Sequence, residues 1–424
     1  MNKLSLIILV FLLISGCSSK DDSYIQEDVR VKIILSKELL EEQEFNTGVE
    51  ISISNGVYND NFDSNQNDQG ELSYEGLFQK VGKYSYSKFD NFKYVDAQPV
   101  FYNEKLIFFD KKGSIILYNK DQEVIWKKNF YNKNEKKLFP KLNFANSNNT
   151  LIITDSIAKY YSVDVDTGEI IWSKSNTVPF NSDIKINKDV FFVVDFSNIL
   201  RCISIKDGSE IWKFKTEESS TRSNTKISIV TDNENIYFNN SIGDITAVNL
   251  NTGKLTWQLP TQNNIINKNA FQLSSSKIVL NDNSLYFSNN KNEFYSIDKQ
   301  TGLINWRNEI NSNLKPIVVE KFIITVSNKG YLYLIEKKTG NIVRINDLFF
   351  NYREIKRKKV FATGFFVAMK KIYVTNTDGK LIVVNLNTGD ILNTIKIARG
   401  KILRPFIDKN KLFLIQNGSI IKYN

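Results

Sequence analysis

Hydrophobic and polar residues alternate along this chain in short runs, and the whole pattern returns about every 40–50 residues. One such run extends from Lys371 to Thr375, and the hairpin-turn sequence Asp378-Gly379 follows it. A second run from Lys380 to Val384 ends at Asn387-Thr388-Gly389. Alternation over this length predicts half-buried β-strands, and the glycines supply the positive φ that tight turns need. Each copy is therefore expected to form a short antiparallel sheet.

The copies align on their last strand, where a tryptophan usually follows the second turn. Seven copies are visible, and their aligned residues are Trp126, Trp172, Trp212, Trp257, Trp306, Arg344 and Asn393. An eighth, truncated copy begins at Lys411 and closes the chain. A repeat of this length, with four strands per copy and no helical periodicity, predicts an all-β, eight-bladed β-propeller of four-stranded antiparallel blades.

The truncated copy lacks its outer strand and would leave an unpaired strand edge. The alternating segment from Gly82 to Phe89 precedes the first blade, and we expect it to supply the missing strand. Seven blades is the alternative. The tryptophans are predicted to fill the gaps between neighbouring blades, because a large aromatic ring on an outer strand can bury much apolar surface there.

The first residues read as a targeting segment. Met1-Asn2-Lys3 is a positive start, and the apolar run from Leu4 to Ile14 is short for a membrane span. The following Ile14-Ser15-Gly16-Cys17 resembles the processing box of bacterial lipoproteins, which implies lipidation of Cys17 after removal of residues 1–16. Ser18 resembles the signal for release to the outer membrane, facing the periplasm. An ordinary secretory peptide is the alternative.

Residues 17–79 are expected to form a lipidated N-terminus and a polar tether. The stretch from Asp60 to Gly70 is too polar to bury a core of its own. Residues 80–424 are assigned to the propeller, so the chain is expected to hold one folded domain behind its tether.

Composition narrows the chemistry. The formal net charge is +10, but the basic residues are scattered, which argues against nucleic-acid binding. The run from Arg353 to Lys359 is an exception, to be interpreted either as a solvated loop or as a contact for an acidic partner or lipid headgroups. Histidine is absent, which excludes Ser-His-Asp and Cys-His catalysis. Cys202 is predicted to be a buried, inert thiol. We predict no catalytic, cofactor or metal site.

The repeat resembles the quinoprotein-type (PQQ-like) propeller repeat, most closely in Tyr160 to Trp172. Two periplasmic families share this repeat: quinone-dependent dehydrogenases and the BamB family of lipoproteins in the outer-membrane β-barrel assembly machinery. The chain has no adjacent cysteines and no recognisable quinone or calcium constellation. Its order of lipoprotein box, tether and eight blades is similar to the BamB plan.

That resemblance implies a non-catalytic scaffold that docks on the periplasmic domains of a BamA-like insertase and assists unfolded outer-membrane proteins. The family's first contact loop corresponds to Ser219 to Ser223, so Thr221 and Arg222 become candidate partner-binding residues. The second loop carries two acidic residues in the family, whereas this chain has Gln272 and Ser274. The alternatives are a propeller lipoprotein that binds cell-envelope material, or a quinone-dependent dehydrogenase.

Overall fold

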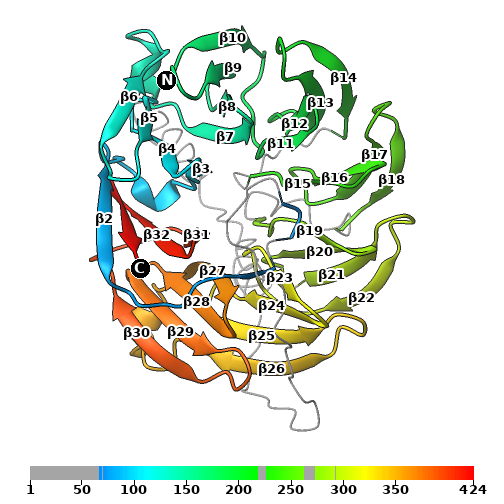
Figure 1. The fold of residues 1–424 in the computed structure, drawn as a ribbon. Coiled ribbons are helices and arrows are strands. Elements are labelled where there is room, and N and C mark those ends of the chain that lie inside the picture. Colours follow the sequence, from blue (N-terminus) through cyan, green and yellow to red (C-terminus); the bar gives the residue numbers. More distant parts are fainter. Residues whose placement is uncertain (1–65, 69, 218–225, 262–272, 292) are drawn as a thin grey trace, which may run out of the picture. The chain divides into compact units, whose positions relative to one another are not determined.

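The computed structural model describes residues 66–424, except 69, 218–225, 262–272 and 292. These residues form eight sheets arranged in a ring, seven of four strands and one of five (Figure 1). The prediction of an eight-bladed, all-β propeller is confirmed, and the seven-bladed alternative is wrong.

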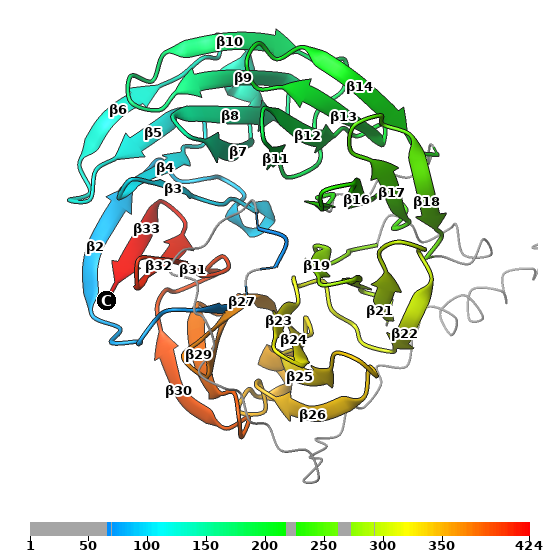
Figure 2. The same cartoon turned by 45° about the vertical axis from the view of Figure 1, so that its right-hand side comes forward.

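Each blade runs from a short inner strand beside the central channel to an outer strand on the rim (Figure 2). The inner strands of blades one to eight are β3 (Val100–Tyr102), β7 (Leu142–Ser147), β11 (Lys185–Asn187), β15 (Ile229–Thr231), β19 (Val279–Asn281), β23 (Ile317–Val319), β27 (Ala362–Ala368) and β31 (Phe406–Asp408). The second strands are β4 (Lys105–Phe109), β8 (Thr150–Asp155), β12 (Val190–Val194), β16 (Asn235–Asn239), β20 (Ser284–Asn289), β24 (Phe322–Val326), β28 (Lys371–Asn376) and β32 (Lys411–Gln416).

The third and outer strands complete the blades. The third strands are β5 (Ile115–Tyr118), β9 (Lys159–Asp164), β13 (Ile199–Ser204), β17 (Ile245–Asn249), β21 (Glu293–Asp298), β25 (Tyr331–Glu336), β29 (Lys380–Asn385) and β33 (Ser419–Tyr423). The outer strands are β6 (Val124–Lys128), β10 (Ile170–Ser175), β14 (Glu210–Lys215), β18 (Leu255–Leu259), β22 (Ile304–Asn308), β26 (Ile342–Asp347), β30 (Ile391–Lys396) and β2 (Lys80–Ser85).

The second strands are more deeply buried than their alternating pattern predicts. In β28 every residue after Lys371 is buried, so the expectation of a half-buried strand is wrong there. Each blade packs between two neighbours, which covers both faces of its middle strands. Phe366, Tyr373 and Leu381 of blade seven, for example, share one apolar cluster with Leu412 and Leu414 of blade eight. The hydrophobic core is thus a series of layers between blades. Cys202 is buried as predicted, and burial raises the pKa of its thiol to about 12.

The ring is closed by strands from the two ends of the chain. β2 is the outer strand of blade eight and pairs antiparallel with β33, with Tyr84 opposite Ile420. The predicted donor segment is confirmed, although the strand covers Lys80–Ser85 and the chain has left the sheet by Phe89.

The tryptophans join adjacent blades, as predicted. Trp126 Nε1 donates a hydrogen bond of 2.9 Å to the carbonyl oxygen of Val165 in the next blade. Trp172 makes the corresponding bond to Ile205 at 2.8 Å. In blade six the buried guanidinium of Arg344 takes the place of the indole and donates to the carbonyl oxygens of Leu386 and Asn387.

The segment before β2 also belongs to the folded ring. β1 (Glu71–Leu72) pairs parallel with the end of β27, which makes the sheet of blade seven five-stranded. The amide of Lys370 donates a hydrogen bond of 2.6 Å to Glu71. Residues that we assigned to the tether therefore contact the propeller before residue 80.

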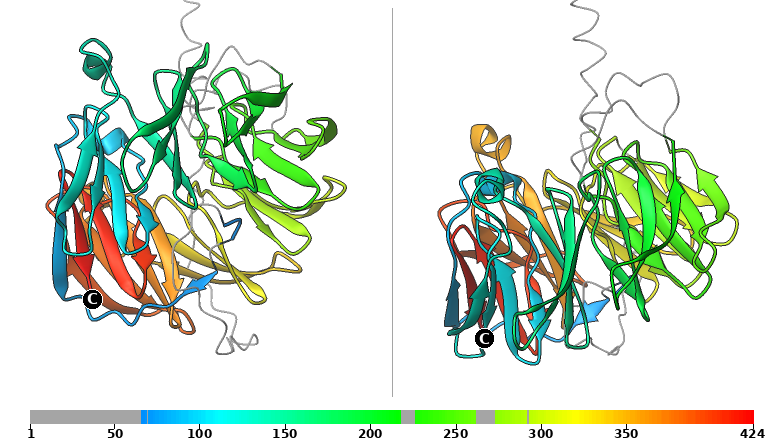
Figure 3. Two further views of the ribbon diagram at one scale, coloured as in Figure 1. Left: turned by 45° about the horizontal axis from the view of Figure 1, so that its top comes forward. Right: turned by 90° about the horizontal axis from the view of Figure 1, so that it is seen from above.

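Short helices occur in the connections that lead from the outer strand of one blade to the inner strand of the next. The face that carries these connections is called the loop face below. Figure 3 shows η3 (Glu135–Leu138) and α3 (Glu354–Arg357) on this face, and β1 towards the opposite one. η2 (Phe92–Tyr94) precedes β3. No helix in the described part of the chain is long and apolar enough to cross a membrane.

The basic run from Arg353 to Lys359 contains α3 and is not a plain solvated loop. Lys356 Nζ lies 3.0 Å from a carboxylate oxygen of Asp378, and an Arg357 guanidinium nitrogen lies 2.6 Å from one of Asp347. Two of its cations are thus paired within the protein.

Candidate functional site

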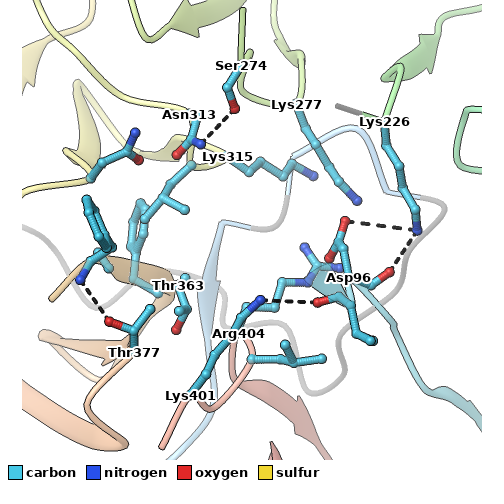
Figure 4. Close-up of a pocket in the computed structure, with 18 of the residues that line it drawn as sticks. Asp96, Lys226, Ser274, Lys277, Asn313, Lys315, Thr363, Thr377, Lys401 and Arg404 are labelled. Atoms are coloured by element: carbon cyan, nitrogen blue, oxygen red, sulfur yellow. Dashed lines mark hydrogen bonds and ion pairs between the residues drawn. The ribbon is translucent and has the colours of Figure 1, made fainter. Parts of the chain in front are cut away.

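The central channel opens on the loop face into a cavity of about 600 Å³, which we call the cup (Figure 4). Its described lining comes from the residues that lead into the inner strands of several blades. The basic lining residues are Lys93, Lys226, Lys277, Lys315, Lys401 and Arg404, and the acidic one is Asp96. The repeat architecture explains this convergence, because every blade directs the start of its inner strand toward the same axis.

Three of these cations occupy the same place in their repeats. Lys277, Lys315 and Arg404 each lie two residues before the first residue of an inner strand, in blades five, six and eight. Asp183 holds that place in blade three, and Gln98 holds it in blade one. The channel is therefore basic on one side and carries a carboxylate and an amide on the other.

Arg404 has room in the cup because of the glycine beside it. A Cβ atom on Gly364, which belongs to the inner strand of blade seven, would overlap the Cβ atom of Arg404. The Arg404 guanidinium carbon lies 4.8 Å from the centre of the Phe406 ring, in a cation–π arrangement.

Two carboxylates neutralise part of this charge. Lys277 Nζ lies 2.5 Å from Asp183 Oδ2, and Lys226 Nζ lies 3.9 Å from Asp183 Oδ1 and from Asp96 Oδ2. Burial opposes ionisation of Asp183, but Lys277 and Lys226 outweigh it and hold the pKa of its carboxyl well below the usual range. The pKa of Asp96 is likewise lowered, because Lys226, Lys277 and Arg404 outweigh the effect of burial.

Lys401, also in the lining of the cup, forms hydrogen bonds with backbone carbonyl groups. Its Nζ donates to the carbonyl oxygens of Lys93 at 2.8 Å and Val95 at 3.3 Å. Burial lowers the pKa of Lys401, while Asp96 raises it. This lysine thus adds positive charge to the cup without a carboxylate partner in hydrogen-bond contact among the described residues.

Lys315 is a buried cation of the cup whose nearest opposing carboxylate is that of Asp68. Within the described residues no hydrogen bond or ion pair within 4 Å joins its ammonium to another side chain. Burial lowers the pKa of Lys315 to about 7, and the positive charges of Lys277, Arg404 and Lys185 act in the same direction. Asp68 opposes them but does not cancel their effect.

The floor of the channel comes from the N-terminal segment. Asn67 exchanges hydrogen bonds with Thr231, donating at 2.6 Å and accepting from its amide at 3.2 Å. Asp68 accepts from the side-chain amide of Asn281 at 3.1 Å and from the amide of Val318 at 3.5 Å. These partners lie in the inner strands of blades four, five and six. A cavity of about 30 Å³, which has room for about one water molecule, adjoins the cup and is lined by Asp183, Lys277, Lys315 and Arg404 among others.

The wall opposite the lysines is polar and aromatic. Asn313 Nδ2 donates a hydrogen bond of 2.8 Å to Ser274 Oγ (Figure 4). Phe361, Thr363 and Phe365 also line the cup. The amide of Ser274 itself donates to Asn290 Oδ1 at 2.9 Å.

Of the residues predicted from the sequence to contact a partner, Ser274 is the one that the structure describes. It lies at the edge of the cup on the loop face. Cys17, Thr221, Arg222 and Gln272 lie outside the described residues. Leu273 is buried, as expected of a core residue.

The cup does not follow from the hydrophobic periodicity of the chain. A signal was present in the repeats, since Lys277-Ile278-Val279, Lys315-Pro316-Ile317 and Arg404-Pro405-Phe406 show a basic residue at one aligned position. Alignment on the outer strand drew attention to the tryptophans instead. The described residues hold no group of three or more Cys, Asp or Glu side chains suited to a metal ion.

Comparison with known proteins identifies the family of this chain. The family model for the outer membrane protein assembly factor BamB matches residues 111–346, more than half of the 424-residue chain. The chain belongs to the BamB family. The resemblance seen in the repeats is thereby confirmed. A comparison with curated protein sequences gives no match.

Solved structures share the fold at low sequence identity. BamB from Moraxella catarrhalis is 17% identical, with 82% of this chain and 100% of that one covered and a TM-score of 0.65. A europium-containing methanol dehydrogenase is 11% identical, with 82% and 86% covered and a TM-score of 0.61. The computationally designed Ika8 protein is 10% identical, with 81% and 99% covered and a TM-score of 0.61. At these identities the similarity shows the fold alone, for BamB and for the dehydrogenase alike.

Proposed function

We propose that this BamB-family chain is a non-catalytic scaffold of the outer-membrane β-barrel assembly machinery. It docks on the periplasmic domains of a BamA-like insertase and assists the folding and insertion of outer-membrane proteins. The family match over residues 111–346 carries this proposal. The propeller suits such a role, since its packed blades form a rigid support from which connecting loops can vary freely.

The loop face is the proposed docking surface. Residues 218–225, which include Thr221 and Arg222, belong to the connection from β14 to β15. Gln272 and Ser274 belong to the next connection, from β18 to β19. Both connections reach the cup, at Lys226 and Lys277. A guanidinium at Arg222 would bind a carboxylate of the partner through two hydrogen bonds.

The N-terminus supplies the proposed anchor. Removal of residues 1–16 and lipidation of Cys17 would place the protein on the outer membrane, facing the periplasm. Several acyl chains hold a protein stably, because each buried methylene contributes about 0.8 kcal/mol. β1, the described strand nearest to this N-terminus, lies towards the face opposite the loop face (Figure 3).

Capture of the tagged, full-length protein from mildly solubilised membranes tests the proposal. We expect the insertase to be recovered with it, and Arg222→Glu to reduce that recovery at least several-fold. Arg399→Glu is the matched control, because Arg399 is exposed in a different connection of the same face. Clean capture without the insertase would contradict the scaffold and favour a propeller that binds other cell-envelope material. Unchanged recovery with Arg222→Glu would exclude only this contact.

A further inference from the structure

We propose that the cup is a binding site for a phosphate-bearing anion. This inference goes beyond the scaffold function and does not depend on it. It rests on the position, burial and pairing of the cations that converge at the loop-face end of the channel.

The first argument is charge. Six basic residues line the described part of the cup, and three carboxylates, Asp96, Asp183 and Asp68, act on them, which leaves an excess of three positive charges when all are ionised. Lysines on an open surface separate and are screened by solvent and salt. Here the side chains of Lys226 and Lys277 are only 22% exposed, so their charges repel one another in a confined space. An anion placed among them relieves that repulsion.

The second argument is Lys315. Its ammonium points into the cup beside Lys277 (Figure 4), and the Asp68 carboxylate that opposes it is already engaged by Asn281 and Val318. Burial lowers the pKa of this lysine more than Asp68 raises it, so the lysine lacks a full counterion. A bound dianion would be that counterion, and it would restore the proton to Lys315.

The third argument is shape. Beneath the cations, Asn67 and Asp68 bind the inner strands of blades four, five and six, and the adjoining cavity there has a volume of only about 30 Å³. A volume of about 600 Å³ falls within the range of small-molecule sites, roughly 300–1,000 Å³. Asn313, Thr363 and the aromatic rings of the opposite wall can contact the uncharged part of a ligand. The ligand is therefore a compact molecule that carries phosphate, either a soluble metabolite or the headgroup of a lipid.

Titration calorimetry of the purified full-length protein in non-ionic detergent, with pyrophosphate as the probe, tests the site. We expect one saturable site per chain. Lys315→Met, which keeps the length of the side chain and removes its charge, should weaken binding at least 10-fold. Lys321→Met is the matched control, because Lys321 is exposed in the turn between β23 and β24, away from the cup, and it should change nothing.

Proton uptake provides a second readout that a purely structural role of Lys315 would not produce. The charged groups facing this lysine are Asp68, Lys277, Arg404 and Lys185. Near pH 7.5 the wild type should take up protons as pyrophosphate binds, visible as a dependence of the binding heat on the ionisation enthalpy of the buffer. Lys315→Met should lose this uptake even if some binding remains.

A second probe, compared with pyrophosphate, separates the two sources of the phosphate. Tighter binding of dihexanoyl phosphatidic acid than of pyrophosphate would support a lipid headgroup, and the reverse order a soluble ligand. Absence of saturable binding for both probes would overturn the proposal. So would equal losses in Lys315→Met and Lys321→Met, because binding would then reflect general surface charge. No partner protein is present in these measurements, so their outcome is independent of the scaffold function.

Discussion

The indole of Trp172 lies directly on Gly208 of the following blade. A Cβ atom on Gly208 would lie 2.6 Å from ring carbon Cε3, well inside van der Waals contact. Trp212 approaches Gly253 in the same way, and Trp126 approaches Gly168. The turn glycine of one blade and the tryptophan of the preceding blade are thus two halves of a single joint. Where the sequence repeats both, the glycine leaves the space that the indole occupies.

Substitution of this glycine should destabilise the ring. Gly208 has a φ of 68°, which disfavours any Cβ, and the ring of Trp172 is held by its hydrogen bond to Ile205. We expect Gly208→Ala to lower the free energy of unfolding by roughly 1–3 kcal/mol, measured by chemical denaturation. Gly400→Ala is the control, because a Cβ atom there would meet nothing within 4 Å. Equal effects of the two substitutions would contradict the joint.

The joint between blades eight and one has the large and small residues exchanged. Gln122 adopts the turn conformation with a φ of 68°, and Gly82 of β2 replaces the tryptophan opposite it. A Cβ atom on Gly82 would lie 2.8 Å from Gln122 Cδ, near the end of a flexible side chain that can move aside. We expect Gly82→Ala to cost less than about 1 kcal/mol in the same denaturation experiment, less than Gly208→Ala. A larger cost would mean that Gln122 is held rigidly.

Arg344 should be essential to the joint between blades six and seven. Its side chain is 1% exposed and satisfies two carbonyl oxygens of the next blade. Burial lowers the pKa of Arg344 to about 10, so it stays charged at neutral pH. Arg344→Leu would leave those carbonyls without this donor and should cost about 1–3 kcal/mol of unfolding free energy. Arg353→Leu, at an exposed arginine, should change stability little.

Lys315 should make the stability of the protein depend on pH. Its pKa is about 7 in the folded protein against an ordinary value of 10.5, so between these values the unfolded chain binds more protons. Stability contributed by this group therefore rises with pH across that window and is constant below it. We expect the free energy of unfolding of the wild type, relative to that of Lys315→Met, to increase between pH 7 and 10 in denaturation experiments without added anions. A constant difference between the two proteins would show that the lysine is not perturbed.

The features that every repeat shares could be predicted from the sequence. The contacts of residues that depart from the repeat were harder to predict. The blades and the closing strand follow from hydrophobic alternation and turn residues, both of which are local. Arg344 could be identified as a missing tryptophan, but its two hydrogen bonds depend on the position of the next blade. Asn67 and Asp68 were assigned to the tether because they are polar. In the structure, however, their side chains form hydrogen bonds with Thr231 and Asn281 in the inner strands.

The cup was missed for a related reason. Lys277, Lys315 and Arg404 are far apart in the sequence, and each alone resembles an ordinary surface cation. They meet because ring closure brings one residue from each of several blades to a common axis. Comparison of aligned positions across the repeats, rather than of neighbours along the chain, would have shown the excess of basic residues.

The pairing of β2 with β33 also determines when the protein can finish folding. Tyr84 is among the first propeller residues to be synthesised, whereas its partner Ile420 is among the last. The sheet edge of β2 must therefore wait, without its eventual neighbour, while more than 300 residues are delivered. Until β33 arrives, the unpaired edge of β2 can pair with other molecules, so closure of the ring also removes an exposed edge from the growing chain.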